Sequence, residues 1–238
     1  MDLLLHGAAQ LGIYLTNLQL DQFALYHREL AEWNQRANLT NIIGFEEVQV
    51  KHFLDSLTVV PAVGEVPPEG RLLDVGAGPG CPGLPLKFVF PGIRLVMAEP
   101  IGKKTAFLEH IVEALALDET TVLRGRAEEL AHDPGLREGF DLVTARGLAR
   151  MPVLLEYTLP FCKLGGKVVA LKHGGAKFEE ELASAERALG LLGGRVQHVY
   201  QVEIDGLTDN RVVVVVEKTK ATPKEYPRRT GTPRKSPL

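Results

Sequence analysis

A glycine-rich run that begins at Asp74 offers the clearest chemical signal in the sequence. It reads DVGAGPGCPG and follows a short apolar stretch. At Gly76, Gly78 and Gly80 the missing Cβ lets the chain turn sharply and lets a ligand pack directly against the main chain. In an open parallel sheet, such a turn lies at the carboxyl ends of the strands, where ligands bind. We therefore predict a ligand site at this turn.

Two classes of cofactor fit the turn. A dinucleotide signature, GxGxxG, matches in the frame that starts at Gly78, so a nicotinamide enzyme is one interpretation. However, Asp74 at the strand end could organise both the loop and the ammonium group of a methionine moiety, whereas a diphosphate prefers helix N–H donors without a nearby acid. Pro79 and Pro82 also interrupt the helix start that a diphosphate would use. These features favour S-adenosylmethionine.

Residues after the next two apolar stretches are suited to an adenosine nucleoside. Glu99 closes the first of them, and a carboxylate there can accept both hydrogens of a ribose diol. Ala127 and Glu128 follow the second and are expected to meet the adenine, Ala127 through its backbone and Glu128 through backbone or side chain. An acid stabilised by the dipole in the first turn of a helix is an equal alternative for Glu128.

Two basic residues close later apolar stretches. Arg146 follows Phe140–Ala145 and could hold the cofactor or clamp an RNA phosphate with two hydrogen bonds. A structural ion pair is the alternative for Arg146. Lys172 follows Gly166–Leu171 and is expected to contact a phosphate or to be a solvated lysine.

Cysteines and histidines give no sign of a metal site. Cys81 and Cys162 form neither a disulfide framework nor a ligand cluster, and neither is expected to act as a nucleophile. His52 and Asp55 lie three residues apart and could pair with each other, far from metal-site geometry. We predict no bound metal.

Short apolar runs alternate with helical patterns from residue 66 to residue 218. This alternation predicts βαβ units and a mostly parallel sheet covered on both faces, closed by an antiparallel hairpin at its edge. The expected strands are Arg71–Val75, Ile93–Ala98, Thr121–Leu123, Phe140–Ala145, Gly166–Leu171, Arg195–Val202 and Arg211–Lys218. The expected helices are Leu84–Phe90, Lys103–Leu117, Met151–Phe161 and Lys177–Leu192.

Two flanking segments differ from this region. Residues 1–65 read as helical and are expected to pack on the core, and the Pro- and Gly-rich link Pro61–Gly70 marks a boundary. Residues 219–238 are basic and contain four prolines, so they are expected to form no regular element. We therefore divide the chain into an N-terminal helical segment (1–65), an α/β domain (66–218) and a basic tail (219–238).

The composition is that of an ordinary globular protein, with 238 residues, 45% of them hydrophobic and 24% charged. The length suits one large α/β domain with a small accessory segment. The longest notable apolar run, Val212–Val216, is far shorter than a bilayer span, and the start of the sequence does not look like a signal peptide. We expect a cytoplasmic protein without membrane contact and without an obligate protein partner.

Charge is unevenly distributed along the chain. Positions 218–238 contain seven basic residues and one acid, a charge of +6, whereas the preceding 217 residues carry −9. This asymmetry predicts a local contact with a polyanion such as RNA, and a solvated, disordered tail is the alternative. If the tail binds RNA, its removal should weaken RNA binding and leave cofactor affinity intact.

Short motifs follow one another in a specific order along nearly the whole chain. They are Trp33-Asn34, Asn38-Leu39-Thr40, His52, Asp55-Ser56-Leu57, the glycine-rich run from Asp74, Gly102-Lys103-Lys104, Phe107-Leu108, the stretch Arg126 to Glu129, Thr144-Ala145-Arg146, Leu171-Lys172, and Tyr226 to Arg229 with Lys235 to Leu238 in the tail. With these motifs the chain resembles the GidB (RsmG) family of bacterial 16S rRNA guanine-N7 methyltransferases.

The resemblance implies a class I, Rossmann-like S-adenosylmethionine methyltransferase with a seven-stranded sheet. It also implies methyl transfer to N7 of a guanine in the 530 loop of 16S rRNA, the family site guanosine 527, with the small ribosomal subunit as partner. By motif it assigns the cofactor to Gly76, Cys81, Glu99, Ala127, Glu128 and Arg146. Because Cys81 stands where the family usually has Leu or a similar apolar residue, it is expected to contribute backbone and packing only.

The expected RNA contacts come from three parts of the chain. They are Asn38, Lys172, Arg228, Arg229 and Lys235. After Lys172 the family commonly has Lys-Gly, whereas this chain has His173-Gly174-Gly175, a difference expected to change a substrate-facing loop.

The implied reaction makes few demands on acid–base chemistry. Guanine N7 has a lone pair and no proton to lose, so attack on the sulfonium methyl needs no general base, and we assign no catalytic acid or base. Orienting the reactants can supply about 7–11 kcal/mol of the barrier. The alternatives are a methyltransferase of the same fold acting on another RNA position or a small molecule, a non-catalytic ribosome-assembly factor, and a nicotinamide reductase.

Overall fold

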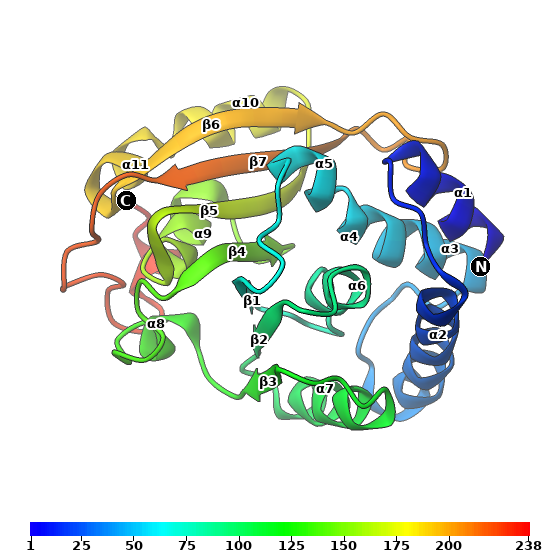
Figure 1. Cartoon of the computed structure of the whole chain (residues 1–238). Helices are drawn as coiled ribbons and strands as arrows, with labels where there is room; N and C mark the ends of the chain where they lie inside the picture. The colour runs from blue at the N-terminus through cyan, green and yellow to red at the C-terminus, as the bar shows by residue number, and fades with distance from the viewer.

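A seven-stranded sheet with the order β3-β2-β1-β4-β5-β7-β6 forms the centre of the structure, a computed structural model that describes residues 1–238 (Figure 1). The strands are β1 (Arg71–Val75), β2 (Arg94–Ala98), β3 (Thr120–Leu123), β4 (Phe140–Arg146), β5 (Cys162–His173), β6 (Gly194–Gln201) and β7 (Arg211–Lys218). The first five run parallel, and β7 pairs antiparallel with both β5 and β6. The predicted Rossmann-like fold with a C-terminal antiparallel hairpin is confirmed.

The order of the parallel strands reverses between β1 and β4. In open α/β sheets the crevice at such a switch point, outside the carboxyl ends of the strands, is where ligands bind. β1 lies between β2 and β4, and Asp74 pairs in register with Met97 on one side and Thr144 on the other. The strand order therefore places the glycine-rich run, which follows β1, at the ligand-binding edge of the sheet.

Helices cover both faces of the sheet. They are α1 (Asp2–Gln10), α2 (Asn17–Ala37), α3 (Phe45–Val48), the π-helix η1 (Gln49–Leu54), α4 (Asp55–Leu57), α5 (Val59–Val63), α6 (Gly83–Val89), α7 (Gly102–Ala114), α8 (Ala127–Leu130), α9 (Met151–Thr158), α10 (Ala176–Ala183), α11 (Glu186–Leu192) and α12 (Thr232–Lys235). None of them is both long and apolar enough to span a bilayer.

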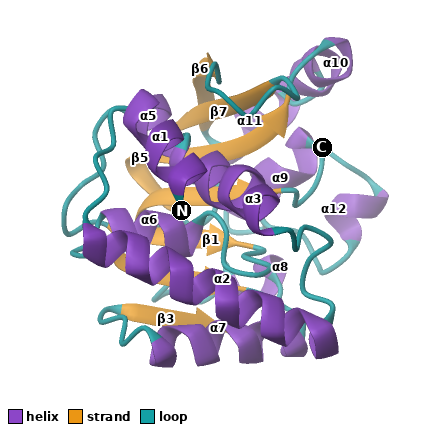
Figure 2. Cartoon of the chain, turned by 90° about the vertical axis from the view of Figure 1, so that its right-hand side faces the viewer, coloured by secondary structure: helices purple, strands orange, loops and turns teal.

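The two faces have separate apolar cores. On one face, α1 to α7 and the sheet contribute to a cluster of 35 buried residues; on the other, α9, α11 and their neighbours contribute to a cluster of 25. Figure 2 shows the N-terminal helices lying across the first face. The N-terminal helical segment therefore shares its apolar core with the sheet.

Local sequence explains the long helix α2. Thr16 and Gln19 form a reciprocal capping box at its start, and Asn38 ends it in the left-handed conformation (φ +49°). Phe23 and Tyr26 lie on its buried face, and α2 packs on α6 and α7. This packing places Tyr26 close to the glycine-rich run.

Several boundaries differ from the prediction: β5 begins at Cys162 instead of Gly166, and α9 ends at Thr158 instead of Phe161. The helix expected over Lys177–Leu192 is broken into α10 and α11, because the Ser184 hydroxyl donates to the Glu181 carbonyl (2.7 Å) and competes with the helical ladder. Pro61, expected in the irregular link, lies in the first turn of α5, where a missing N–H costs little. The link itself is confined to residues 64–70.

The tail contains a regular element, contrary to the prediction. α12 begins after Gly231 (φ +82°), and Pro233 is tolerated because it lies in the first helical turn. Upstream of α12, Arg137 donates hydrogen bonds to the carbonyls of Thr222, Pro223 and Tyr226. The predicted alternative of a solvated tail is wrong. The prolines keep this part of the tail out of a helix or sheet, but side-chain donors of the α/β domain bind its backbone carbonyls.

Candidate active site

The glycine-rich loop joins β1 to α6 at the switch point, with a backbone that requires glycine. Gly76, Gly78 and Gly80 have φ angles of +70°, +60° and +108°. A Cβ at Gly76 would lie 2.6 Å from Leu148 Cδ1. The loop therefore offers bare main chain to the crevice, as expected for a surface on which a cofactor packs.

Asp74 holds this loop in place. Its side chain is fully buried, with Oδ2 accepting from the Gly83 N–H (2.9 Å) and Oδ1 from the Thr144 hydroxyl (3.0 Å). Burial raises the pKa of Asp74 to about 6, against the lowering effect of these hydrogen bonds. The predicted organising role agrees with this geometry, whereas the buried carboxylate leaves no surface for an ammonium group.

Glu99 directly follows β2, and hydrogen bonds tie its side chain to the same loop. Oε2 accepts from the Gly78 N–H (2.9 Å) and Oε1 from the Ile101 N–H (2.9 Å). Each carboxylate oxygen can accept more than one hydrogen bond, so the group retains capacity for a diol. Glu99 therefore fits a ribose while positioning the loop.

A pocket opens between the loop, the end of β2 and the start of α8. Its lining residues are Val75, Gly76, Ala98, Pro100, Gly125, Arg126, Ala127, Glu128, Leu148, Tyr157 and Arg234. Three predicted cofactor residues, Gly76, Ala127 and Glu128, thus meet in one cavity. Bare glycine backbone and apolar walls suit the surface of an adenosine group, and the cavity of about 60 Å³ would receive only part of that group.

The Glu128 side chain is already engaged. One of its oxygens accepts from the Gly231 N–H in the tail (3.1 Å). Tyr157 lies beside it, and burial together with the Glu128 carboxylate raises the pKa of that tyrosine. A carboxylate oxygen can accept further hydrogen bonds, so both predicted modes of contact between Glu128 and adenine, through backbone or side chain, stay predictions.

Cys81 does not line this pocket. It is buried on the opposite side of the loop, with Sγ 3.4 Å from the Tyr26 hydroxyl, and burial raises the pKa of its thiol. The neutral, buried thiol agrees with the predicted packing role. Sequence reasoning missed the contribution of Tyr26, whose hydroxyl donates to the Pro79 carbonyl within the loop (2.6 Å). Nothing in the sequence indicates this contact, because Tyr26 has the helical spacing of an ordinary apolar-face residue.

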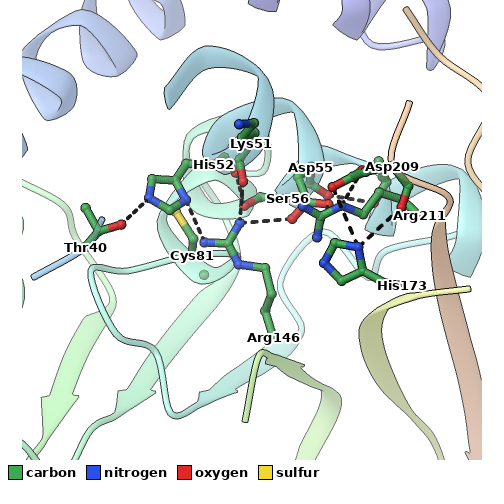
Figure 3. Close-up of polar contacts among 12 residues, drawn as sticks. Thr40, Lys51, His52, Asp55, Ser56, Cys81, Arg146, His173, Asp209 and Arg211 are labelled. Carbon is green, nitrogen blue, oxygen red and sulfur yellow. Dashed lines mark hydrogen bonds and ion pairs between the residues drawn. The ribbon is translucent and has the colours of Figure 1, made fainter. Parts of the chain in front are cut away.

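Arg146 at the end of β4 is held by the N-terminal segment (Figure 3). Nη1 donates to Asp55 Oδ2 (3.0 Å) and to the Lys51 carbonyl (3.0 Å), and Nη2 lies 3.0 Å from His52 Nδ1. The suggested pairing of His52 with Asp55 is therefore wrong, because both bind Arg146 instead. A guanidinium carries five N–H donors, so two of them remain for a ligand.

His52 is neutral at physiological pH. Burial, followed by the Arg146 charge, lowers its pKa to about 3. Nδ1 faces a guanidinium and must accept, so Nε2 carries the proton and donates to the Thr40 hydroxyl (3.0 Å). The histidine thus fixes Arg146 without adding charge. His52 lies in η1, and π-helices are rare elements that are often found at functional sites.

A second cavity of about 280 Å³ adjoins Arg146 at the carboxyl ends of β4 and β5. Its lining residues are Ile42, Lys51, His52, Asp55, Arg146, Gly147, Leu171, Lys172, His173 and Arg211. We call it the cationic cleft, because its lining contains four cations, Lys51, Arg146, Lys172 and Arg211, and one acid, Asp55. Three acids outside the lining, Glu47, Glu181 and Asp209, pair with Lys51, Lys172 and Arg211. Asp55 lies 3.6 Å from Arg211 and shares its charge between the two arginines.

The residues predicted to contact RNA differ in whether their side chains are already bound within the protein. The Lys172 ammonium donates to Glu181 Oε1 and the Ala149 carbonyl (both 2.6 Å), so it is neither a solvated lysine nor a free phosphate contact. Arg228 is likewise occupied by Glu156 and the Ser236 carbonyl. Arg229 and Lys235 are exposed and form no ion pair. Asn38 is exposed at the end of α2 and does not line either cavity.

Solved structures share this architecture at low sequence identity. MtNAS in complex with MTA and tNA superposes with a TM-score of 0.57 at 18% identity, covering 85% of this chain and 75% of that one. A variant of MtNAS in complex with S-adenosylmethionine gives 0.57 at 17%, with 85% and 77% covered. The precorrin-6y C5,15-methyltransferase from Geobacter metallireducens gives 0.51 at 17%, with 68% and 86% covered. These similarities concern the fold.

Curated relatives match over the full length. The chain is 46% identical to the ribosomal RNA small subunit methyltransferase G of Dehalococcoides mccartyi strain BAV1, covering 100% of both chains. It is also 46% identical to the protein of that name from Lactobacillus johnsonii, covering 97% of this chain and 96% of the relative. Residues 19–210 match the GidB family, described as rRNA small subunit methyltransferase G. The expected cofactor, S-adenosylmethionine, is confirmed, and the chain belongs to the GidB family of methyltransferases.

Proposed function

We propose that this protein transfers the methyl group of S-adenosylmethionine to N7 of a guanine in the 530 loop of 16S rRNA, the family site guanosine 527. The observation that carries the proposal is the intact cofactor crevice of a chain that matches rRNA methyltransferases from end to end. A protein that had lost its activity would not need positive-φ glycines and a buried Glu99 at this turn.

Two groups of residues would hold the cofactor. The glycine-rich loop, through Gly76, Gly78 and Gly80, would contact it directly, and Glu99 with Ala127 would bind its adenosine half. Asp74, Cys81, Glu128 and Arg146 complete the set, the first two by shaping the loop. The bound cofactor supplies an electrophilic methyl group on a sulfonium centre.

No residue needs to remove a proton from the substrate. Guanine N7 attacks through a lone pair, so the protein contributes by holding the base in line and excluding water. Methylation leaves a positive charge on the purine, which nearby carbonyls or a carboxylate would stabilise. The fully buried Asp74 and the engaged Asp55 act on position rather than as bases.

The cationic cleft is the proposed entry for RNA. It lies at the carboxyl ends of β4 and β5, and its four lining cations could exchange their present partners, Glu47, Asp55, Glu181 and Asp209, for RNA phosphates. Its size accommodates one nucleotide rather than a duplex, so the target guanine would enter from a loop or after leaving its stack. Arg146 lines this cleft and keeps two N–H donors for a ligand.

The test is methyl transfer from labelled S-adenosylmethionine to small subunits from cells that lack this gene, followed by nucleoside mass spectrometry and mapping of the modified fragment. One stoichiometric 7-methylguanosine in the 530-loop fragment is the expected product. Label in another nucleoside would reject the N7 assignment and favour a different RNA position. Absence of label with the cofactor bound would favour the non-catalytic assembly factor.

A further inference from the structure

The end of the chain returns to the cofactor pocket. We call residues Tyr226–Leu238 the C-terminal strap. It begins at Tyr226, whose carbonyl accepts from Arg137, and includes α12, which packs against α9 (Figure 2). The strap therefore lies on the face of the sheet opposite to the N-terminal helices, beside α8 and α9.

A buried ion pair anchors the strap. Arg228 binds Glu156 through Nε (2.8 Å) and Nη2 (2.6 Å), and the Arg228 backbone N–H donates to the same carboxylate (2.8 Å). Glu156 is fully buried in α9. His132 adds a hydrogen bond to the Pro227 carbonyl (3.0 Å). A bidentate pair at a buried site fixes position as well as charge.

Beyond this anchor the strap contacts the pocket walls. The Gly231 N–H donates to Glu128 and the Thr230 hydroxyl donates to Glu129 (both 3.1 Å). Arg234 Nη2 donates to the Leu148 carbonyl (3.3 Å). The Arg234 side chain itself lines the pocket, together with residues of the glycine-rich loop and α8.

We propose that the strap is a wall of the adenine end of the cofactor pocket and that Arg234 is a cofactor-binding residue. The adenine end is indicated because the strap contacts Glu128 and Glu129, the first turn of α8. A guanidinium at an apolar wall attracts the face of an aromatic ring and covers it from water. This inference rests on the proposed assignment of the pocket to the cofactor.

Neighbouring cations of the strap serve as an internal contrast. Arg229, Arg234 and Lys235 are all exposed and form no ion pair, but only Arg234 lines the pocket, so the basic charge of the tail does not by itself explain the placement of Arg234. The expectation that removal of the tail leaves cofactor affinity intact is replaced by the opposite one. The strap contributes to the pocket as well as to the charge of the tail.

The experiment measures binding of S-adenosylmethionine and of 5′-methylthioadenosine by calorimetry to the full-length protein, Arg234→Ala and Lys235→Ala. The second variant is the matched control, because it removes one exposed cation from the next position of α12. We expect Arg234→Ala to raise both dissociation constants about fivefold, as the loss of one cation–π contact and its packing predicts. Lys235→Ala should bind both ligands like the wild type, and thermal melting should confirm that both variants are folded.

Several outcomes would overturn this inference. Unchanged affinities in Arg234→Ala, with weaker RNA binding, would make Arg234 an RNA contact only. An effect on S-adenosylmethionine but not on 5′-methylthioadenosine would place Arg234 at the methionine end instead. If the wild-type protein bound neither ligand, the assignment of the pocket itself would fail, and the inference with it.

Discussion

Asp74 is a carboxylate whose burial opposes its charge. Its pKa is about 6 in the folded protein and close to 3.8 when exposed, so the folded state takes up a proton first as the pH falls. The stability associated with this protonation is present below pH 3.8 and is lost as the pH rises through 6. At neutral pH the burial of this charge therefore lowers the free energy of unfolding, while the hydrogen bonds of Asp74 hold the loop in place.

Asp74→Asn should remove this pH dependence. The amide can still accept from the Gly83 N–H and donate to Thr144. Between pH 7 and pH 5 the wild-type free energy of unfolding should rise by about 1 kcal/mol relative to the variant. Urea unfolding at both pH values measures the difference, with the exposed Asp21→Asn as control. Parallel curves for wild type and Asp74→Asn would contradict the assigned cause.

Arg228 and Arg229 form a natural pair for comparison. Arg228→Ala leaves the buried Glu156 carboxylate without its cation, and we expect a loss of about 3–5 kcal/mol in the free energy of unfolding. Arg229→Ala removes an exposed charge of the same kind and should change stability by less than about 0.5 kcal/mol. Equal effects in denaturant titrations would show that the Glu156 pair does not hold the tail.

Helix α2 carries the contact that sequence reasoning missed. Tyr26→Phe removes the hydroxyl that donates to the Pro79 carbonyl and keeps the ring in the core. One lost hydrogen bond in the cofactor loop predicts a dissociation constant for S-adenosylmethionine about 3–10 times higher. Tyr14→Phe, at a side chain that is 83% exposed, is the control for calorimetry. If both variants bind equally well, α2 does not position the loop.

Elements with strong local signals could be predicted, and those decided by distant partners could not. The seven strands and the glycine-rich turn are encoded in short apolar runs and in glycines at alternate positions, which is why their places were correct. The break at Ser184 depends on one hydroxyl, and the folding of the tail depends on Arg137 and Glu156, far away in the sequence. Likewise Gly76 and Ala127 could be assigned to one pocket, whereas Tyr157 and Arg234 could not.

At the scale of the whole molecule, cations lie at both ends of the parallel strands. The cationic cleft and the exposed strap cations lie toward the carboxyl ends of the parallel strands, whereas Arg94 begins β2 at the opposite edge. A polyanion bound at the active site would meet the first set only. Association should therefore weaken with salt according to the number of phosphates contacted.

Arg229→Ala should weaken binding of a 530-loop RNA fragment without changing cofactor affinity. Loss of one phosphate contact should reduce the slope of log affinity against log salt by about 0.7. Arg94→Ala, also the loss of one exposed guanidinium, should leave both affinity and slope unchanged. Filter binding over a salt series measures these slopes, and equal behaviour of the two variants would exclude the strap from the RNA interface.

The pairing of Glu156 with Arg228 also has a consequence for folding during synthesis. The two residues are separated by 72 positions, so a ribosome has made all of α9 long before it adds the cation that α9 needs. Nascent domains start to fold from their amino-terminal side, but an unpaired buried carboxylate opposes the packing of α9 into the core. The strap is synthesised later still than β7, the strand that must insert between β5 and β6. If the strap is a wall of the cofactor pocket, as proposed, a chain that ends before the strap should bind S-adenosylmethionine more weakly than the full chain.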